Sequence, residues 1–70
     1  MKIRLYDKDN KLIEARETFI DIDYLIDNLY NLCGEVVEKM EIVRETTEGN
    51  FIEEVKGWEN ILNYVIEHKG

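Results

Sequence analysis

The chain has 70 residues, enough for one small domain with a thin hydrophobic core. Hydrophobic residues make up 44% of the chain and charged residues 36%, a globular mixture that argues against wholesale disorder. Nine basic residues against sixteen acidic ones give a net charge of -7, which disfavours binding to nucleic-acid phosphates and to anionic membranes, because both attract cationic side chains.

The rest of the composition bears on the cellular compartment. No apolar stretch approaches the roughly 20 residues of a membrane span, and the alternating start from Met1 to Leu5 lacks the apolar core of a secretory leader. Cys33 is the only cysteine and cannot form an internal disulfide, which fits a reducing environment. We therefore expect a cytoplasmic protein that does not contact membranes.

The acidic charge divides almost equally between the two halves of the chain. Residues 1–35 carry eight acidic and five basic side chains, and residues 36–70 carry eight and four. This division predicts an evenly acidic surface with no acidic tail and no basic lobe. Such a surface keeps a small protein soluble, and it also suits docking on a basic partner by imitation of phosphates.

The first twenty residues predict a hairpin. Residues 2–6 and 11–19 alternate between apolar and polar side chains, which is typical of strands, around a cluster of turn-forming residues. If the apolar residues of both strands share a face, Leu5 lies opposite Ile13. This register requires a three-residue loop with Asn10 in the left-handed conformation that asparagine tolerates.

An amphipathic helix follows the hairpin. Its apolar residues recur at the three- and four-residue spacing of one helix face. They are Ile22, Leu25, Ile26, Leu29, Leu32 and Cys33. We expect Asp21 or Asp23 to cap the helix N-terminus and Gly34 to end the helix.

The second half of the chain repeats this plan. Residues 37–46 and 51–56 predict two strands around a turn at residues 47–50, and Gly57 separates the return strand from a second helix that begins at Trp58. The apolar stripe of this helix is Trp58, Ile61, Leu62, Val65 and Ile66.

The register of the second hairpin is chosen by its side-chain pairs. A four-residue loop aligns apolar residues and opposite charges at the same time, which stabilises neighbouring strands. The expected pairs are Thr46 with Phe51, Ile42 with Val55, Arg44 with Glu53, and Glu41 with Lys56.

These elements follow the order ββαββα. Two hairpins form one four-stranded antiparallel sheet, and two helices pack on one face, so residues 1–70 make a single α+β domain. The halves 1–34 and 36–70 resemble a weak internal ββα repeat. The strand order stays open, because the hairpins can join through either edge, or each half can pair with its copy on a second chain.

The chain has no glycine-rich phosphate loop and no CxxC, HExxH or GxSxG motif. Cys33 lies on an apolar stripe near a helix C-terminus, where the dipole disfavours a thiolate, so we expect it in the core. His68 is expected to cap the last helical turn. Asp21, Asp23 and Asp27 lack the glycine and final glutamate of a calcium loop, which favours capping and a solvated helix face. We therefore expect no enzymatic activity, no cofactor and no metal site.

The sheet face away from the helices is predicted to mix apolar and charged side chains, as protein interfaces do. The candidate partner-binding residues are Tyr6, Leu12, Val43, Ile52, Glu41, Glu45 and Glu54. The same face is predicted to hold Arg4, Glu14, Arg16 and Lys56. The helix-side face is predicted to hold Ile3, Leu5, Ile13, Ala15, Met40, Ile42, Phe51 and Val55. The alternative is that strand propensity alone places aromatic and β-branched residues on the free face.

A non-enzymatic protein-interaction module fits these features best. It binds another protein, or itself as a homodimer, through the free face or an edge strand. A sharper version, by analogy of size and charge, is an acidic inhibitor of the phage or mobile-element type that occupies the basic groove of a nucleic-acid-handling enzyme. The alternative is a small homo-oligomeric ligand- or metal-binding domain, since so short a chain rarely encloses a pocket alone. Direct nucleic-acid binding ranks last, because Tyr6 is the only aromatic residue predicted on the free face.

Overall fold

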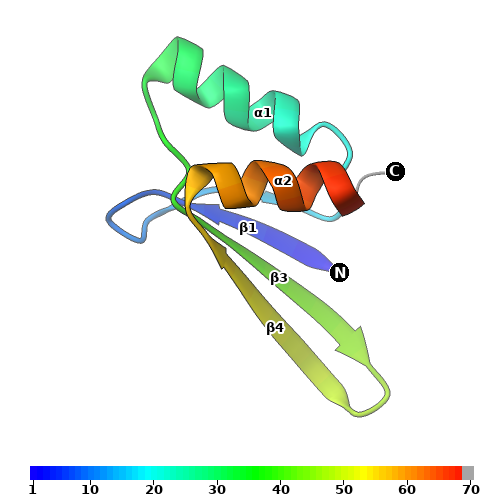
Figure 1. Cartoon of the computed structure of the whole chain (residues 1–70). Helices are drawn as coiled ribbons and strands as arrows, with labels where there is room; N and C mark the ends of the chain where they lie inside the picture. Colours follow the sequence, from blue (N-terminus) through cyan, green and yellow to red (C-terminus); the bar gives the residue numbers. More distant parts are fainter. Residues whose placement is uncertain (69–70) are drawn as a thin grey trace.

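Two hairpins and two helices alternate along the chain in the computed structural model, which describes residues 1–68 (Figure 1). The strands are β1 (Lys2–Tyr6), β2 (Leu12–Arg16), β3 (Lys39–Thr46) and β4 (Gly49–Lys56). The helices are α1 (Ile22–Asn28), which continues as the π-helical segment η1 (Leu29–Cys33), and α2 (Trp58–His68). The predicted ββαββα order and α+β class are confirmed.

The two hairpins join at the centre of one sheet. The strand order is β2-β1-β3-β4, and all three neighbouring pairs are antiparallel. The strand order that the sequence left open is therefore settled by pairing of β1 with β3. Both helices lie on the same side of the sheet (Figure 1). Within residues 1–68, no helix has the length and apolar character needed to cross a membrane.

The core lies between the sheet and the helices. Ile3 and Leu5 of β1 and Met40 and Ile42 of β3 point toward the helices and have no exposed surface. The remaining buried residues are Phe19, Ile22, Ile26, Val37, Ile61 and Val65. Burial of each large aliphatic side chain contributes roughly 1.5–3 kcal/mol, so the helix-side face of β1 and β3 serves stability. The opposite face and the two edges of the sheet remain for contacts.

The first hairpin begins as expected and then shifts by one residue. The Asp7 amide donates to the Lys11 carbonyl at 3.0 Å, and Asn10 has φ 60, so the predicted three-residue loop and left-handed residue are confirmed. Tyr6 pairs with Leu12, but Leu5 pairs with Glu14. The predicted register therefore holds for the pair of Tyr6 with Leu12, but the predicted pairing of Leu5 with Ile13 is wrong.

A β-bulge causes this shift. One extra residue of β2, Ile13, is accommodated between the Tyr6–Leu12 and Leu5–Glu14 pairs, and a bulge reverses the face on which the following residues lie. Ala15 pairs with Arg4 and thus lies on the free face, whereas Glu14 and Arg16 lie on the helix side. The sequence predicted the opposite placement of these three residues. Ile13 itself packs against the core as expected.

The second hairpin is tighter than predicted. Thr46 pairs with Gly49 across a two-residue turn, and the Thr46 hydroxyl donates to the Gly49 carbonyl at 2.7 Å. Gly49 has φ 125, a conformation that favours glycine. The tighter turn extends β4 by two residues at its start and moves the register by two residues, whereas β3 ends at Thr46 as predicted and begins later than predicted, at Lys39. The four predicted pairs are therefore wrong, but every residue keeps its face because the shift is even.

The two-residue shift gives the second hairpin new partners. Met40 pairs with Val55, Ile42 with Glu53, Glu41 with Glu54, and Arg44 with Phe51. Arg44 still contacts Glu53 along the diagonal, at 2.9 Å between Nη1 and Oε1. The predicted contact of Glu41 with Lys56 is replaced by an ion pair between Glu41 and Arg4 on the neighbouring strand β1.

Helix α1 differs from its expected form at both ends. Asp21 occupies the N-cap position with φ 64 and makes no side-chain capping bond. At the other end the chain widens into η1, so residues no longer recur at the α-helical period. As a result Leu32 is 82% exposed and Cys33 is exposed, which contradicts their predicted burial. Gly34 ends the segment with φ 69, as expected.

Helix α2 buries most of its predicted stripe. Ile61 and Val65 are fully buried, and Trp58 packs against the core while its ring stacks on Tyr30 with a centroid distance of 5.3 Å. Ile66 departs from the prediction, because it is 56% exposed. The helix therefore covers β3 and the nearer part of β4 with a narrow apolar face.

Candidate partner-binding surfaces

The free face of the sheet is built in rows across the strands. All seven candidate residues predicted from the sequence lie on this face, because the register places them on the side opposite the buried residues of β1 and β3. The first row is Leu12, Tyr6, Lys39 and Lys56. The second row is Ala15, Arg4, Glu41 and Glu54. The third row is Lys2, Val43 and Ile52, and the fourth is Glu45 and Asn50.

Charged contacts divide the apolar residues of this face into two ends. Tyr6 and Leu12 lie at one end, where the Lys39 Nζ atom stands 4.4 Å from the centre of the Tyr6 ring. Val43 and Ile52 lie at the other end. The structure therefore does not bring the four apolar candidates into one patch.

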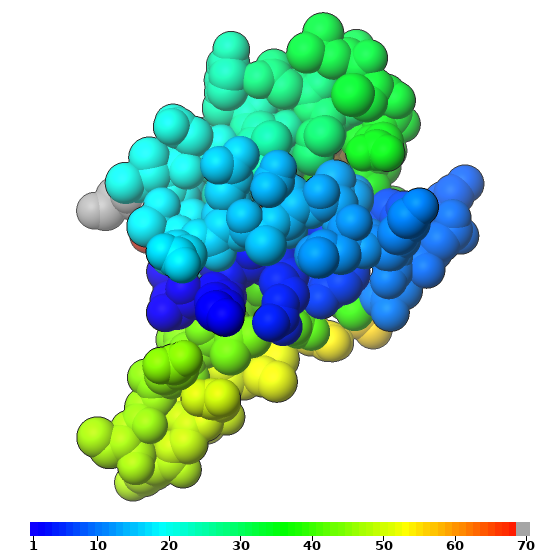
Figure 2. Space-filling model, turned by 180° about the vertical axis from the view of Figure 1, so that it is seen from behind, coloured from blue at the N-terminus to red at the C-terminus, as the bar shows by residue number. Residues whose placement is uncertain are grey.

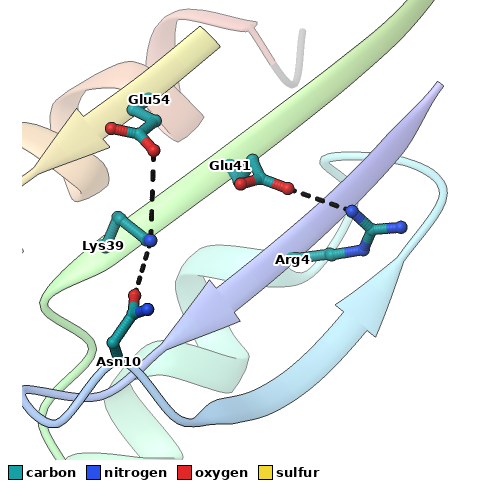
Figure 3. Close-up of polar contacts among 5 residues, drawn as sticks. All are labelled: Arg4, Asn10, Lys39, Glu41 and Glu54. Atoms are coloured by element: carbon teal, nitrogen blue, oxygen red, sulfur yellow. Dashed lines mark hydrogen bonds and ion pairs between the residues drawn. The ribbon is translucent and has the colours of Figure 1, made fainter. Parts of the chain in front are cut away.

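The dividing contacts come from neighbouring strands (Figure 3). Arg4 donates to Glu41 at 3.0 Å. Lys39 donates to the Asn10 side-chain oxygen at 2.6 Å and lies 3.9 Å from Glu54. Two of the predicted acidic contact residues, Glu41 and Glu54, are thus already engaged with cations of the same face.

The free face is not the source of the protein's negative charge. Its four rows hold four cations, Lys2, Arg4, Lys39 and Lys56, against three glutamates, Glu41, Glu45 and Glu54. An imitation of phosphate by this face is therefore not supported by its charge, and the excess of carboxylates lies elsewhere.

The excess lies in one continuous segment, residues 17–38, which we call the acidic α1 layer. The segment holds six acidic residues and no lysine or arginine. They are Glu17, Asp21, Asp23, Asp27, Glu35 and Glu38. The layer thus has a net charge of -6 out of the -7 of the whole chain. The equal division between the halves concealed this concentration, and the prediction of an evenly spread charge is wrong at this scale.

The acidic α1 layer occupies one end of the molecule. Its atoms, coloured from cyan to green, form the upper part of the space-filling view, away from the tip of the hairpin of β3 and β4 (Figure 2). It also exposes large apolar side chains between its carboxylates. Ile20 is 65% exposed, Tyr24 69%, Tyr30 48% and Leu32 82%. The sequence placed Leu32 on the apolar stripe of the helix, so its exposure beside the two tyrosines was not predicted.

A second cluster, missed by the sequence analysis, links α2 to the second hairpin. Arg44 donates through Nη1 to Glu53 and through Nη2 to the Tyr64 hydroxyl, both at 2.9 Å. The Tyr64 hydroxyl and the Arg44 guanidinium hold the pKa of Glu53 below its usual value, and hydrogen bonds to Tyr64 and Glu53 raise the pKa of Arg44. The choice of a register that pairs opposite charges indicated the Arg44–Glu53 contact, although the register itself was wrong, whereas nothing local pointed to Tyr64.

The side chains with intrinsic reactivity do not converge on one site. His68 lies in the last turn of α2, as predicted, where Nδ1 lies 2.8 Å from the Tyr64 carbonyl and the ring stacks on Tyr64 at 3.9 Å. A carbonyl can only accept, so Nδ1 carries the proton. Cys33 lies in η1. In the described part of the chain, no three His, Cys, Asp or Glu side chains are grouped to hold a metal ion.

The surface hollows are open and lined mainly by charged residues. Their volumes are about 290, 260 and 330 Å³. The first lies between the β1–β2 turn and residues 34–38, and the third lies between the same turn and the ends of β3 and β4. Neither Cys33 nor His68 lines any of the three, so the hollows do not join a reactive side chain to an enclosed space.

No family model matches the chain, and comparisons with curated proteins and with solved structures find no significant match. The function must therefore be argued from the surfaces described above.

Proposed function

We propose that the chain is a non-enzymatic protein-interaction module that binds a basic protein through the acidic α1 layer. The observation that supports this most directly is the concentration of six carboxylates, without a single lysine or arginine, in residues 17–38. The paired cations Arg4, Arg16, Lys39 and Arg44 contact glutamates outside this segment. Because the segment itself contains no lysine or arginine, its carboxylates form a surface of one charge sign, which suits a basic partner.

Charge of one sign accelerates the encounter with a partner of the opposite sign. Carboxylates on one end of a small protein produce a field that extends about 10 Å at moderate salt and raises association rates. A surface rich in lysine and arginine is the complement. The basic groove of a nucleic-acid-handling enzyme is such a surface, so inhibition by occupation of that groove is the sharper form of the proposal.

The exposed apolar residues of the layer supply affinity once contact is made. Tyrosine at the centre of an interface contributes more than most residues, because its large rigid ring loses little conformational freedom. Tyr24 lies one helical turn from Asp27 on the exposed side of α1 and is 69% exposed. An aromatic ring among carboxylates suits lysine and arginine side chains, which combine an apolar stem with a cationic head.

The test compares two variants with the same change in net charge. The layer variant carries Glu17→Gln, Asp27→Asn and Glu35→Gln, and the control variant carries Asp9→Asn, Glu45→Gln and Glu67→Gln. All six positions are exposed. Each immobilised protein is incubated with the heparin-binding fraction of a lysate from the source cells, because heparin retains proteins with basic grooves.

We expect the wild type and the control variant to retain the same protein, and the layer variant to lose it. Retention should fall when salt rises from about 50 to about 300 mM, because the attraction is screened. Replacement of Tyr24 by alanine should weaken retention without changing its salt dependence. Equal retention by the two triple variants would contradict the acidic α1 layer as the binding surface.

A further inference from the structure

Strand β4 is an edge of the sheet with no other described element on its outer side. Its register with β3 runs without a break from Thr46–Gly49 to Lys39–Lys56, and residues 49–54 are all exposed. Proteins usually protect such edges with a proline, a bulge, a very short strand or charged side chains. Strand β4 has eight residues, no proline and no bulge, and its charges are confined to its C-terminal half, at Glu53, Glu54 and Lys56. The opposite edge, β2, has five residues and is interrupted by the bulge at Ile13.

The hairpin of β3 and β4 projects beyond the helices (Figure 1). Both of its faces are therefore uncovered near the tip. Phe51 on the helix side and Ile52 on the free face are each 63% exposed. A partner that covers only one face of the sheet leaves one of these residues in water, whereas a strand that pairs with the edge of β4 shelters both.

We infer that β4 pairs with β4 of a second copy of this chain, antiparallel and related by a two-fold axis at Ile52. In an antiparallel pair, residues that lie directly opposite each other point to the same face of the sheet. A two-fold axis between two residues of β4 would pair residues of opposite faces, so the axis must pass through a single residue. Because a two-residue turn makes Thr46–Gly49 a hydrogen-bonded pair, the backbone groups of Asn50, Ile52 and Glu54 point outward and are available to the second copy.

Strand length and charge select the axis. Within β4, an axis at Ile52 or at Glu53 aligns the largest part of the strand with its copy, and an axis at Glu53 places that glutamate directly opposite its own copy, which is destabilising. An axis at Ile52 places Ile52 opposite Ile52, Asn50 opposite Glu54, and Phe51 opposite Glu53. This register contains no directly opposed like charges within β4.

The same axis completes an apolar stripe. Val43 pairs with Ile52 on the free face of each chain, so the dimer aligns Val43, Ile52, Ile52 and Val43 across the joined sheet. On the other face, the two Phe51 side chains become diagonal neighbours at about 7–8 Å, a distance that aromatic rings can bridge. The contact is narrower than the roughly 1,200 Å² of a stable interface, so the dimer forms reversibly and depends on concentration.

Dimerisation at β4 is independent of the proposed binding of a basic protein, because the acidic α1 layer lies at the other end of the molecule (Figure 2). A dimer presents two such layers, and a partner with two basic surfaces is then bound with greater avidity.

Sedimentation equilibrium over a range of concentrations tests the dimer with purified protein alone. The mass of the wild type should rise with concentration from 8.4 kDa toward twice that value. Ile52→Lys should remain a monomer, because the axis brings two like charges together. Ile66→Lys makes the same chemical change at another exposed position, 56% exposed on α2, and should dimerise like the wild type.

A disulfide trap tests the register and does not depend on the stability of the lysine variant. In a Cys33→Ala background, Ile52→Cys should form a covalent dimer in a glutathione redox buffer, because the two Cα atoms lie at about 5.5 Å. Asn50→Cys should not, since its opposite residue is Glu54. A wild type that stays at 8.4 kDa, or equal trapping at both positions, would overturn the inference.

Discussion

Tyr64 determines how helix α2 meets the second hairpin. Its hydroxyl accepts a hydrogen bond from Arg44, which also donates to Glu53, and its ring contacts the rings of Phe19 and His68 at centroid distances of 5.7 and 3.9 Å. One side chain thus joins a strand pair, a connecting loop and a helix end. Because both charged partners are partly exposed, the ion pair contributes modestly to stability.

Tyr64→Phe is expected to destabilise the fold in a manner that depends on pH. The hydroxyl helps to hold the pKa of Glu53 below its usual value of 4.5. A lowered pKa in the folded state contributes stability that is present above about pH 4.5 and is lost as the pH falls through the folded pKa. We expect a loss of about 1 kcal/mol or less at pH 7, and a smaller loss at about pH 3. Urea denaturation at both values measures it.

Tyr24→Phe is the matched control for this variant. Tyr24 is 69% exposed on α1, away from Arg44 and Glu53, and loss of its hydroxyl should leave stability unchanged at both pH values. A loss for Tyr64→Phe that is as large in acid as at neutral pH would show that the Glu53 carboxylate is not involved.

Single residues were predictable where local chemistry decides. Asn10 in the left-handed region and His68 at a helix end follow from the backbone preferences of asparagine and the dipole of the helix. Cys33 was predicted wrongly, because its burial assumed regular α-helix geometry, and Asp21, one of two residues expected to cap α1, occupies the N-cap position without a side-chain hydrogen bond. The widening of η1 turns Cys33 outward, and the positive φ of Asp21 prevents a side-chain cap.

Among the elements, the junction of η1 with β3 depends most clearly on one backbone conformation. Gly34 has φ 69, and its amide and that of Glu35 close the helical segment on the carbonyls of Tyr30 and Leu29, both at 3.1 Å. A Cβ atom added at Gly34 would meet no other atom within 4 Å. The requirement for glycine is therefore one of backbone strain and not of space.

Gly34→Ala should cost about 1 kcal/mol of unfolding free energy. Gly34→Asn should cost less, because asparagine tolerates the left-handed region better than other residues with a side chain. Thermal or chemical denaturation of both variants measures the difference. Equal stability of the alanine variant and the wild type would mean that the chain leaves η1 through another conformation.

The order and approximate positions of the elements were predictable from alternation, but their exact bounds and registers were not, since β2 ends at Arg16 and β4 begins at Gly49. The register error in the first hairpin arises from its bulge, and that in the second from its turn. The sequence cannot distinguish a two-residue from a four-residue loop at residues 47–50 by pattern alone, because both keep the same faces. The bulge at Ile13 depends on how β2 pairs with β1, where Arg4 lies opposite Ala15. The residues around Ile13 do not determine this pairing, so the bulge could not be predicted from the local sequence.

At the scale of the whole molecule, the dominant feature is the separation of charge. The free face of the sheet balances cations with glutamates, whereas the acidic α1 layer has carboxylates only. The sequence contained this signal in the stretch without lysine or arginine between Arg16 and Lys39, and comparison of the two halves averaged it out. What the sequence could not provide is the exposure of Leu32 and Ile20 beside the carboxylates.

Carboxylates concentrated in one layer repel one another and lower the stability of the folded state. Asp27 and Glu35 add to this cost, because they flank the C-terminal part of the α1–η1 helix, where the dipole is negative. A loss of folding stability caused by concentrated carboxylates is consistent with the proposed binding of a cationic partner, which would neutralise them. Residues chosen for solubility alone would tolerate interspersed lysines equally well.

The layer variant with Glu17→Gln, Asp27→Asn and Glu35→Gln should therefore be more stable than the wild type at low salt. Relief of three like-charge interactions is worth about 1 kcal/mol in total, which corresponds to a rise in Tm of roughly 4–8 °C for a domain of this size. The gain should shrink at about 0.5 M salt, where the Debye length is only a few ångströms.

The control variant with Asp9→Asn, Glu45→Gln and Glu67→Gln loses the same charge, but Asp9 lies between Lys8 and Lys11 and Glu45 beside Arg44. Scanning calorimetry of both variants at two salt concentrations distinguishes repulsion within residues 17–38 from repulsion by the net charge of the whole chain. An equal rise in Tm for the two variants would mean that the net charge sets the repulsion.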